Sequence, residues 1–348
     1  MNIPDIADLH DAGLTPLPAR LQHLIDNKTK PVGSLGQLER LAVRIGTILG
    51  SESPTLQHPQ LLVCAGDHGL AAHGVSAYPS DVTWQMVQNF VGGGAAVSVL
   101  ARQHGLALTV VDCGVRHDFA PVPGLIIRKI AAGTADASIG PAMNPSQCAE
   151  AIANGREVVR MLPGNALLLG EMGIGNTSAA SLLLSRLAGL PLDDCVGAGT
   201  GLDAAGLARK RAVLTEVSAL HRNAVAPLDA LAAFGGFEIA TLVGAVLQAA
   251  AERRVIVVDG FITGAAVLVA TALQPYVVQR CVAAHVSAEP GHALLLDYLA
   301  LQPLLRLDLR LGEGSGAALA WPLLESASRI LREMASFESA GVSRQDGA

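Results

Sequence analysis

The stretch NALLLGEMGIGNTSAASLLLSRLAG (residues 165–189) joins a continuous apolar run to a glycine-rich turn and an alanine-rich segment. The run at 165–173 does not alternate with polar residues, which is typical of a strand covered on both faces. The segment at 177–189 carries apolar residues at helical spacing. The stretch therefore predicts a buried strand that leads directly into a helix.

The same order of strand and helix recurs through the middle of the chain. The further predicted strands are residues 61–69, 107–115, 254–262 and 280–289, and the further predicted helices are residues 204–223 and 237–254. This alternation is typical of an α/β fold with a parallel sheet. Ligands of such sheets bind beyond the carboxyl ends of the strands, where the Gly, Asp, Glu and His residues of this chain fall.

The two chain ends predict a separate helical part. Residues 17–49 predict two helices around KTKPVGSLG, and residues 315–337 predict one long helix with Ser315 as its N-cap. We expect a large α/β domain at 50–312, and a small helical domain built from 1–49 and 313–348.

Composition restricts the class of protein. Of the 348 residues, 51% are hydrophobic and 16% are charged, which is enough for a large aliphatic core. The net charge is −6 and the 24 Lys and Arg residues are scattered, so we expect no nucleic-acid partner. Five widely spaced cysteines predict buried free thiols. The acidic start, MNIPDIADLHDAG, and the lack of a long uncharged apolar segment favour a cytoplasmic protein without membrane contact.

Two glycine-rich turns precede predicted helices. In GEMGIGNTSAAS (170–181) the backbone N–H groups at the positive end of the helix suit a phosphate, although the spacing also fits a simple tight connection. It matches neither the dinucleotide nor the Walker pattern. The second turn, GAGTGLD (197–203), precedes Lys210, which could reach back to the same phosphate or lie on the surface in water.

Two further stretches carry acids and histidines. In VIVVDGFITGAA (255–266), Asp259 could hold a ribose hydroxyl or cap the next helix; because Gly260 follows it, the paired acids of magnesium-dependent pyrophosphate chemistry are missing. The region 65–97 favours an apolar pocket for a flat heterocycle. A metal site is disfavoured, because its histidines and those of HVSAEPGH (285–292) lack the spacing of known metal motifs.

In LGEGSGA (311–317), Glu313 lies between glycines and next to apolar runs, on a predicted strand-to-helix turn. Desolvation there would raise its pKa and make it a general base near neutral pH. Contact with a helix N-terminus would lower its pKa instead. The local sequence leaves both interpretations open.

Taken in order, these stretches resemble the nicotinate-nucleotide–dimethylbenzimidazole phosphoribosyltransferase family, also called CobT. The matching motifs are KTKPVGSLGQLERLA, AGDHG with GVSAYPSDVTWQMV, GTAD with GPAM, GEMGIGNTSAAS, GTGLD, HVSAEPGH and RLGEGSGAALAWPLLE, and they extend over residues 28–325. The resemblance implies a Rossmann-like fold and a homodimer. It also implies transfer of the 5-phosphoribosyl group from nicotinate mononucleotide to 5,6-dimethylbenzimidazole in assembly of the cobalamin lower ligand, without cofactor or metal.

The resemblance also implies roles for particular residues. Glu313 is the implied catalytic base. The implied acceptor-binding residues are Ser76, Tyr78, Gln85, Met86 and Leu311. The implied nucleotide- and phosphate-binding residues are Glu171, Gly173, Gly175, Asn176, Thr177, Gly199, Gly201 and Lys210. Two alternatives remain: transfer to other purine or phenolic acceptors, and a non-catalytic nucleotide-binding module.

Overall fold

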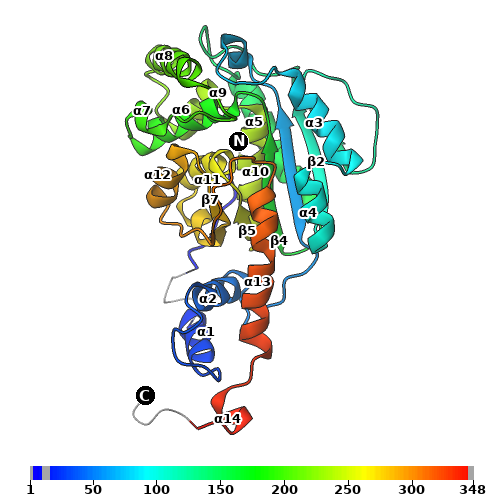
Figure 1. The fold of residues 1–348 in the computed structure, drawn as a ribbon, viewed down its shortest axis with the longest axis vertical. Coiled ribbons are helices and arrows are strands. Elements are labelled where there is room, and N and C mark those ends of the chain that lie inside the picture. Colours follow the sequence, from blue (N-terminus) through cyan, green and yellow to red (C-terminus); the bar gives the residue numbers. More distant parts are fainter. Residues whose placement is uncertain (1–2, 10–15, 344–348) are drawn as a thin grey trace.

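Six parallel strands form the central sheet, in the order β3-β2-β1-β4-β5-β6 (Figure 1). The computed structural model describes residues 3–9 and 16–343. The strands are β1 (Gln60–Gly66), β2 (Ala107–Gly114), β3 (Leu125–Ile127), β4 (Ala166–Met172), β5 (Val255–Val258) and β6 (Cys281–Ala283). A second, two-stranded sheet pairs β7 (His285–Val286) with β8 (Leu305–Arg306). The predicted parallel α/β fold is confirmed, and the short strand β3 is an addition to it.

Both faces of the sheet are buried, as the continuous apolar runs predict. In β1, Leu61 and Val63 pack into one apolar cluster, whereas Leu62 and Cys64 pack into the other. The first cluster contains helices α1 (Leu17–Asp26), α2 (Gln37–Leu49), α3 (Asp81–Gly92), α4 (Ala96–His104) and α13 (Ser315–Glu333). The second contains α5 (Pro145–Met161), α6 (Asn176–Ala188), α9 (Pro227–Phe234), α10 (Phe237–Ala251) and α11 (Phe261–Leu273). All five cysteines are buried free thiols, as predicted.

The remaining elements lie around this core. They are the α-helices α7 (Leu192–Cys195), α8 (Ala204–Leu220), α12 (Pro290–Tyr298) and α14 (Phe337–Ala340), and the 3-10 helices η1 (Gly69–His73) and η2 (Pro275–Arg280). Within residues 3–9 and 16–343, none of the helices has both the length and the apolar character that a membrane crossing requires.

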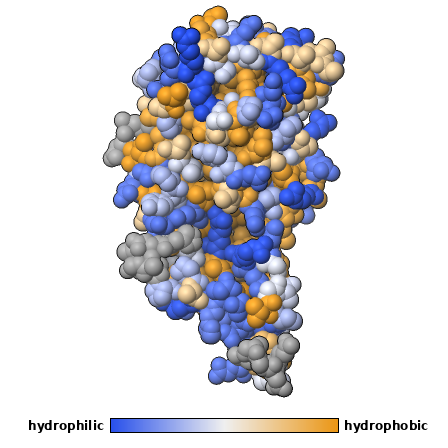
Figure 2. Space-filling view, turned by 90° about the vertical axis from the view of Figure 1, so that its left-hand side faces the viewer, coloured by the Kyte–Doolittle hydropathy of each residue, from blue (hydrophilic) through white to orange (hydrophobic). Residues whose placement is uncertain are grey.

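Helices from the two chain ends lie together at one end of the molecule (Figure 1). The Lys28 ammonium donates to the Met334 carbonyl oxygen at 2.7 Å, and the Phe337 N–H donates to the Asn27 carbonyl oxygen at 3.1 Å. Side chains on this end are mainly hydrophilic in Figure 2, which views the molecule from the side of α7, α8 and α12. The two helices predicted in residues 17–49 are confirmed.

Helix α13 links this end to the sheet and differs from its prediction at both ends. It stops at Glu333, because Met334 has extended backbone angles. Ser315 is not its N-cap: Gly314 holds that position, and the Ser315 hydroxyl donates to the Gly312 carbonyl oxygen at 2.7 Å. The first turns of α13 lie against the sheet, and the later turns pack on α2.

Candidate active site

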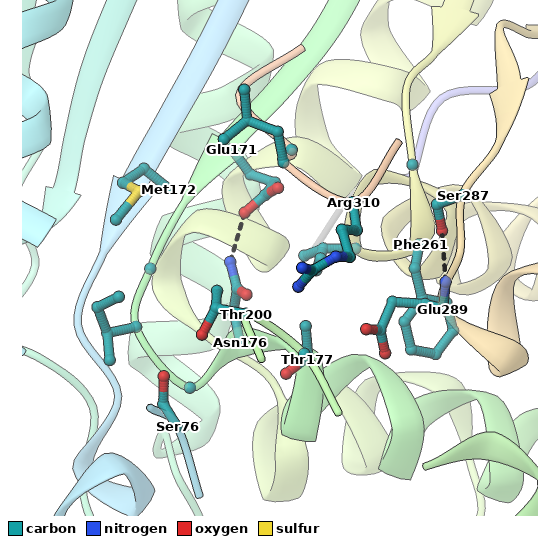
Figure 3. A pocket seen from close by; sticks show the side chains of 18 of the residues that line it. Ser76, Glu171, Met172, Asn176, Thr177, Thr200, Phe261, Ser287, Glu289 and Arg310 are labelled. Atoms are coloured by element: carbon teal, nitrogen blue, oxygen red, sulfur yellow. Dashed lines mark hydrogen bonds between the residues drawn. The ribbon is translucent and has the colours of Figure 1, made fainter. Parts of the chain in front are cut away.

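The candidate site lies where the order of the strands reverses. The chain passes from β1 to β2 on one side and from β4 to β5 on the other, so a crevice opens at the carboxyl ends of β1 and β4. A cavity that is open to solvent occupies this position. Its lining residues are Val75, Ser76, Glu171–Thr177, Gly199, Thr200, Gly260–Ile262, His285, Ser287, Glu289 and Arg310–Gly312 (Figure 3).

The glycine-rich turn after β4 forms one wall of the cavity. Gly173 and Gly175 line it, and Asn176 begins helix α6, so backbone N–H groups and the helix N-terminus face the space. The Asn176 amide donates to a Glu171 carboxylate oxygen at 2.5 Å. Thr177 and Gly199 also line the cavity. The structure therefore brings together six of the eight residues expected to bind the nucleotide.

The other two, Gly201 and Lys210, lie outside the lining of the cavity. Lys210 is completely buried, so the interpretation as a surface lysine is wrong. Its ammonium donates to the Thr177 hydroxyl and to the Gly197 carbonyl oxygen, each at 3.0 Å. Burial lowers the pKa of Lys210 to about 8, and the nearby Glu289 carboxylate opposes that change. Lys210 thus places a positive charge behind the wall formed by Thr177.

The opposite wall contains residues to which no role was assigned from the sequence. His285, Ser287 and Glu289 come from the motif HVSAEPGH, and Arg310 directly precedes Leu311. Figure 3 shows the Arg310 guanidinium between Glu171 and Glu289. The sequence could have indicated these residues. HVSAEPGH was among the matching motifs, and Arg310 begins the motif that contains Glu313.

Glu313 is buried, with 5% of its surface exposed, and it lies behind the cavity wall: its neighbour Gly312 lines the cavity, whereas Glu313 does not. The N–H of Val97, in the first turn of α4, donates to its carboxylate. Burial raises the Glu313 pKa to about 7; the Val97 N–H lowers it, and the charge of Asp259 raises it further. Among the described residues, the Glu313 Oε2 atom has no hydrogen-bond partner. Both expected effects on the Glu313 pKa are therefore present, and the increase caused by desolvation is larger than the decrease caused by the N–H of α4.

The turn that carries Glu313 adopts a left-handed backbone. Gly312, Glu313 and Gly314 have φ angles of 83°, 66° and 90°. The turn lies against β4, because a Cβ atom on Gly170 would come within 2.4 Å of the Glu313 carbonyl oxygen. The predicted strand before this turn is absent: β8 ends at Arg306, and irregular chain follows.

Glu171 and Glu313 form a pair of acids with raised pKa values. Burial raises the Glu171 pKa to about 8; the Asn176 amide lowers it, and the charges of Asp259, Glu238 and Glu313 raise it. Desolvation together with neighbouring negative charge keeps such carboxyl groups protonated close to neutral pH. Perturbed pKa values of this kind are typical of functional sites.

The residues expected to bind the acceptor are only partly brought together. Ser76 and Leu311 line the cavity. Tyr78 is 53% exposed and Gln85 is exposed, and neither lines it. Met86 is partly buried against the apolar cluster that contains α3 and α4. Among the hydrogen bonds of the described residues, none joins Glu313 to any of these five expected acceptor-binding residues.

The histidines considered for a metal site have other partners. His68 lies 2.6 Å from the Glu238 carboxylate, and His285 lies 3.7 Å from that of Asp259. His292 accepts a hydrogen bond from the Ser287 N–H at 2.9 Å. Over residues 3–9 and 16–343, no group of three or more His, Cys, Asp or Glu side chains is arranged to hold a metal ion.

Comparison with known proteins identifies the family. A family model described as Phosphoribosyltransferase matches residues 15–342. A nicotinate-nucleotide–dimethylbenzimidazole phosphoribosyltransferase from Variovorax paradoxus (strain S110) is 78% identical, over 99% of this chain and 98% of its own length. The chain belongs to the nicotinate-nucleotide–dimethylbenzimidazole phosphoribosyltransferase family. A second member, from Cupriavidus necator, is 58% identical over 99% of both chains.

Solved structures of the nicotinate-nucleotide–dimethylbenzimidazole phosphoribosyltransferase family share the fold. Two from Thermus thermophilus, one titled with the family name and one titled CobT, superpose with TM-scores of 0.91 and 0.92. They are 42% and 43% identical to this chain and cover 95% of it and 100% of their own length. The resemblance drawn from the ordered motifs is therefore confirmed, and the chain is a phosphoribosyltransferase.

Proposed function

We propose that this chain transfers the 5-phosphoribosyl group from nicotinate mononucleotide to 5,6-dimethylbenzimidazole. The products are α-ribazole 5′-phosphate, used for the lower ligand of cobalamin, and nicotinate. The observation that carries the proposal is the Glu313 carboxyl group, which is buried, has a pKa raised to about 7 and keeps one oxygen without a donor among the described residues. A group with these properties can accept a proton near neutral pH.

The reaction needs a proton acceptor at one defined point. The nicotinate ring of the donor is a pyridinium, so breaking the C1′–N bond returns the electron pair to the ring and neutralises it. One benzimidazole nitrogen then attacks C1′ from the opposite face, which inverts the β linkage to α. The Glu313 carboxylate takes the proton from the other nitrogen. General-base help of this kind contributes about 10²–10⁴ in rate, or about 3–5 kcal/mol.

The donor phosphate has its best place at the N-terminus of α6. The backbone of Gly173–Gly175 faces the cavity there, and Thr177 carries the hydrogen bond from buried Lys210. The Arg310 side chain points into the same space and supplies a second cation (Figure 3). We place the nicotinate mononucleotide phosphate between these groups.

The acceptor belongs on the Glu313 side of the cavity. Ser76 and Leu311 line the cavity. Tyr78, in the loop between η1 and α3, and Gln85 and Met86, on α3, are proposed to contact the benzimidazole as well. Positioning of two substrates in line supplies the rest of the rate enhancement.

We also propose the division into a large domain at 50–312 and a small domain at 1–49 and 313–348.

The test is nicotinate release from nicotinate mononucleotide, with and without 5,6-dimethylbenzimidazole. Release should depend on the acceptor, and Glu313→Gln should lower its rate by at least about 10² while leaving nicotinate mononucleotide binding unchanged. Glu325→Gln, an exposed change on helix α13, which follows the Glu313 turn, is the control and should keep full activity. Retention of most activity by Glu313→Gln at saturating substrate contradicts the role of the carboxyl group.

The same assay separates the alternatives. Faster release with adenine or p-cresol than with 5,6-dimethylbenzimidazole would assign the enzyme to another acceptor class. Binding of nicotinate mononucleotide without release in the presence of any acceptor would indicate a non-catalytic binding module. Glu313 argues against that module, because a phosphate receptor has no use for a buried, ionisable carboxyl group.

A homodimer and a cytoplasmic location complete the proposal. The loop between α1 and α2 is held by a buried ion pair of Lys30 and Glu39 at 2.9 Å, and it presents Val32 with 69% of its surface exposed. An exposed apolar side chain on a loop held by a buried ion pair suits contact with a second subunit. Five buried free thiols suit a reducing compartment.

A further inference from the structure

The turn that carries Glu313 has a conformation that needs external support. Glu313 has a φ of 66° between two left-handed glycines. A left-handed backbone is unfavourable for a residue with a side chain, because its Cβ atom comes too close to the following carbonyl oxygen. Glu313 is therefore held in place by its surroundings and not by its own preference.

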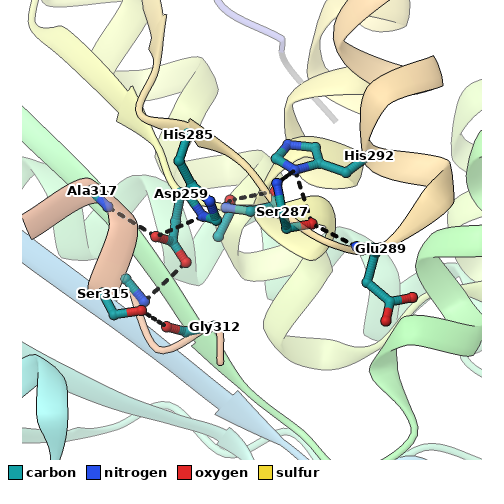
Figure 4. A network of polar contacts seen from close by, with 11 residues as sticks. Asp259, His285, Ser287, Glu289, His292, Gly312, Ser315 and Ala317 are labelled. Carbon is teal, nitrogen blue, oxygen red and sulfur yellow. Dashed lines mark hydrogen bonds and ion pairs between the residues drawn. The ribbon is translucent and has the colours of Figure 1, made fainter. Parts of the chain in front are cut away.

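Asp259 supplies that support on the helix side of the turn. One of its carboxylate oxygens accepts from the Gly314 N–H at 3.2 Å, and the other accepts from the Ala317 N–H at 2.9 Å. The Gly316 N–H donates to the same carboxylate. Figure 4 shows the Asp259 carboxylate facing the start of α13. It also shows the hydrogen bond between the Ser315 hydroxyl and the Gly312 carbonyl oxygen within the same turn. Asp259 thus binds most of the N–H groups that a helix start leaves without partners.

This role differs from both roles expected from the sequence. Asp259 caps α13, which begins far along the chain at Ser315, and not α11, the next helix, whose N-cap Gly260 lacks a side chain. Asp259 is 1% exposed, and both of its carboxylate oxygens already accept N–H groups of the turn and of α13. It directly follows β5, which fixes its position within the sheet.

We propose that Asp259 is a positioning residue, whose carboxylate holds the left-handed turn so that the Glu313 side chain remains in its buried place against α4. This inference rests on the proposed function, because it assigns to Asp259 the orientation of the base. Through Asp259, the carboxyl end of β5 is hydrogen-bonded to the N-terminus of α13, directly after the turn that carries Glu313.

The charge of Asp259 has a second effect. The groups that face Glu313 are Asp259 after β5, Glu171 at the end of β4 and the Val97 N–H of α4. Burial raises the pKa of Asp259, whereas His285 and the three backbone N–H groups lower it. Because both Asp259 oxygens accept N–H donors, the ionised carboxylate fits this geometry. Its charge raises the Glu313 pKa, so removing it should lower that pKa.

The decisive experiment is a double-mutant cycle of Asp259→Asn and Glu313→Gln. Asp259→Asn alone should lower kcat by about 10–100-fold with little change in the KM for nicotinate mononucleotide, since misplacing a reacting group by about 1 Å costs rate on this scale. The acidic limb of its pH–rate profile should move to lower pH. In the Glu313→Gln background the same change should alter the residual rate by less than about twofold, because the base it positions is gone.

Asp112→Asn is the matched control. Asp112 is also completely buried at the end of a strand, and its carboxylate accepts N–H bonds from Gly114 and Val115 at 3.1 and 2.9 Å. This variant should lose thermal stability but keep its pH–rate profile. Asp259→Glu retains the charge but moves the acceptor, so it should lower kcat and leave the acidic limb in place.

The outcomes separate failure of this inference from failure of the proposed function. Full activity of Glu313→Gln overturns the proposed function itself. If Glu313→Gln is slow but Asp259→Asn keeps wild-type kcat, or lowers the Glu313→Gln rate by a further tenfold, the positioning role is wrong. If neither Asp259 variant gives a folded circular-dichroism spectrum while Asp112→Asn does, Asp259 serves the fold as a whole, and the inference also fails.

Discussion

At the residue scale, Glu313 predicts a particular pH dependence. Only the carboxylate form can accept a proton, and burial raises the pKa of Glu313 to about 7. The kcat/KM for 5,6-dimethylbenzimidazole should therefore rise about tenfold per pH unit below pH 7 and level off above about pH 8. Initial rates between pH 5 and 9 in buffers of constant ionic strength measure this profile. A limb centred at pH 4–5 in the wild-type enzyme would show that Glu313 is exposed to water.

The sequence could single out Glu313 as the candidate base, but it could not predict the environment of that side chain. The glycines around Glu313 predict an acid in an unusual turn. The pKa of Glu313 depends on Val97 and Asp259, which come from distant parts of the chain. For the same reason the sequence could not decide between a surface and a buried Lys210. Its partners, Thr177 and Gly197, are set by tertiary packing.

At the element scale, helices α5 and α10 pack unusually closely. A Cβ atom on Gly155 would lie 1.8 Å from the Thr241 carbonyl oxygen, and one on Gly244 would lie 1.9 Å from the Ile152 carbonyl oxygen. Backbone cannot move aside as a flexible side chain can. These two glycines therefore set the distance between the helices that cover one face of the sheet.

This contact predicts a loss of stability on adding one methyl group. Gly155→Ala should lower the free energy of unfolding by about 1–3 kcal/mol, through overpacking between the two helices. Gly92→Ala, in helix α3 with open space around it, is the control and should leave stability unchanged or slightly raised. Urea denaturation followed by circular dichroism measures both. An equal response of the two variants would contradict the close packing.

The pattern of apolar residues predicted elements better than their arrangement. The continuous runs located β1, β2, β4 and β5 to within a few residues, because both faces of these strands are buried. Strand β3 has only three residues, too few for a pattern to emerge. The order of the strands follows from contacts between distant segments, which no local period encodes.

At the scale of the whole molecule, the proposed dimer depends on the loop that carries Val32. Val32→Asp should weaken self-association by at least about tenfold, because an exposed apolar tip would become a charge at the interface. Sedimentation velocity over a range of concentrations measures the change. Val225→Asp, at a side chain that is 67% exposed, is the control. An unchanged dimer in the Val32 variant would exclude this loop from the interface.

Helix α13 joins the turn that carries Glu313 to the helices of the chain ends. Its 19 residues span about 28 Å, since an α-helix rises about 1.5 Å per residue. Over this length, a tilt of about 2° around the far end would displace the near end by about 1 Å, a displacement large enough to misalign a proton transfer. The Arg332 guanidinium donates to the Pro54 carbonyl oxygen at 3.1 Å near the far end of α13. We expect substitutions that remove this contact to alter turnover, although they lie far from the substrates.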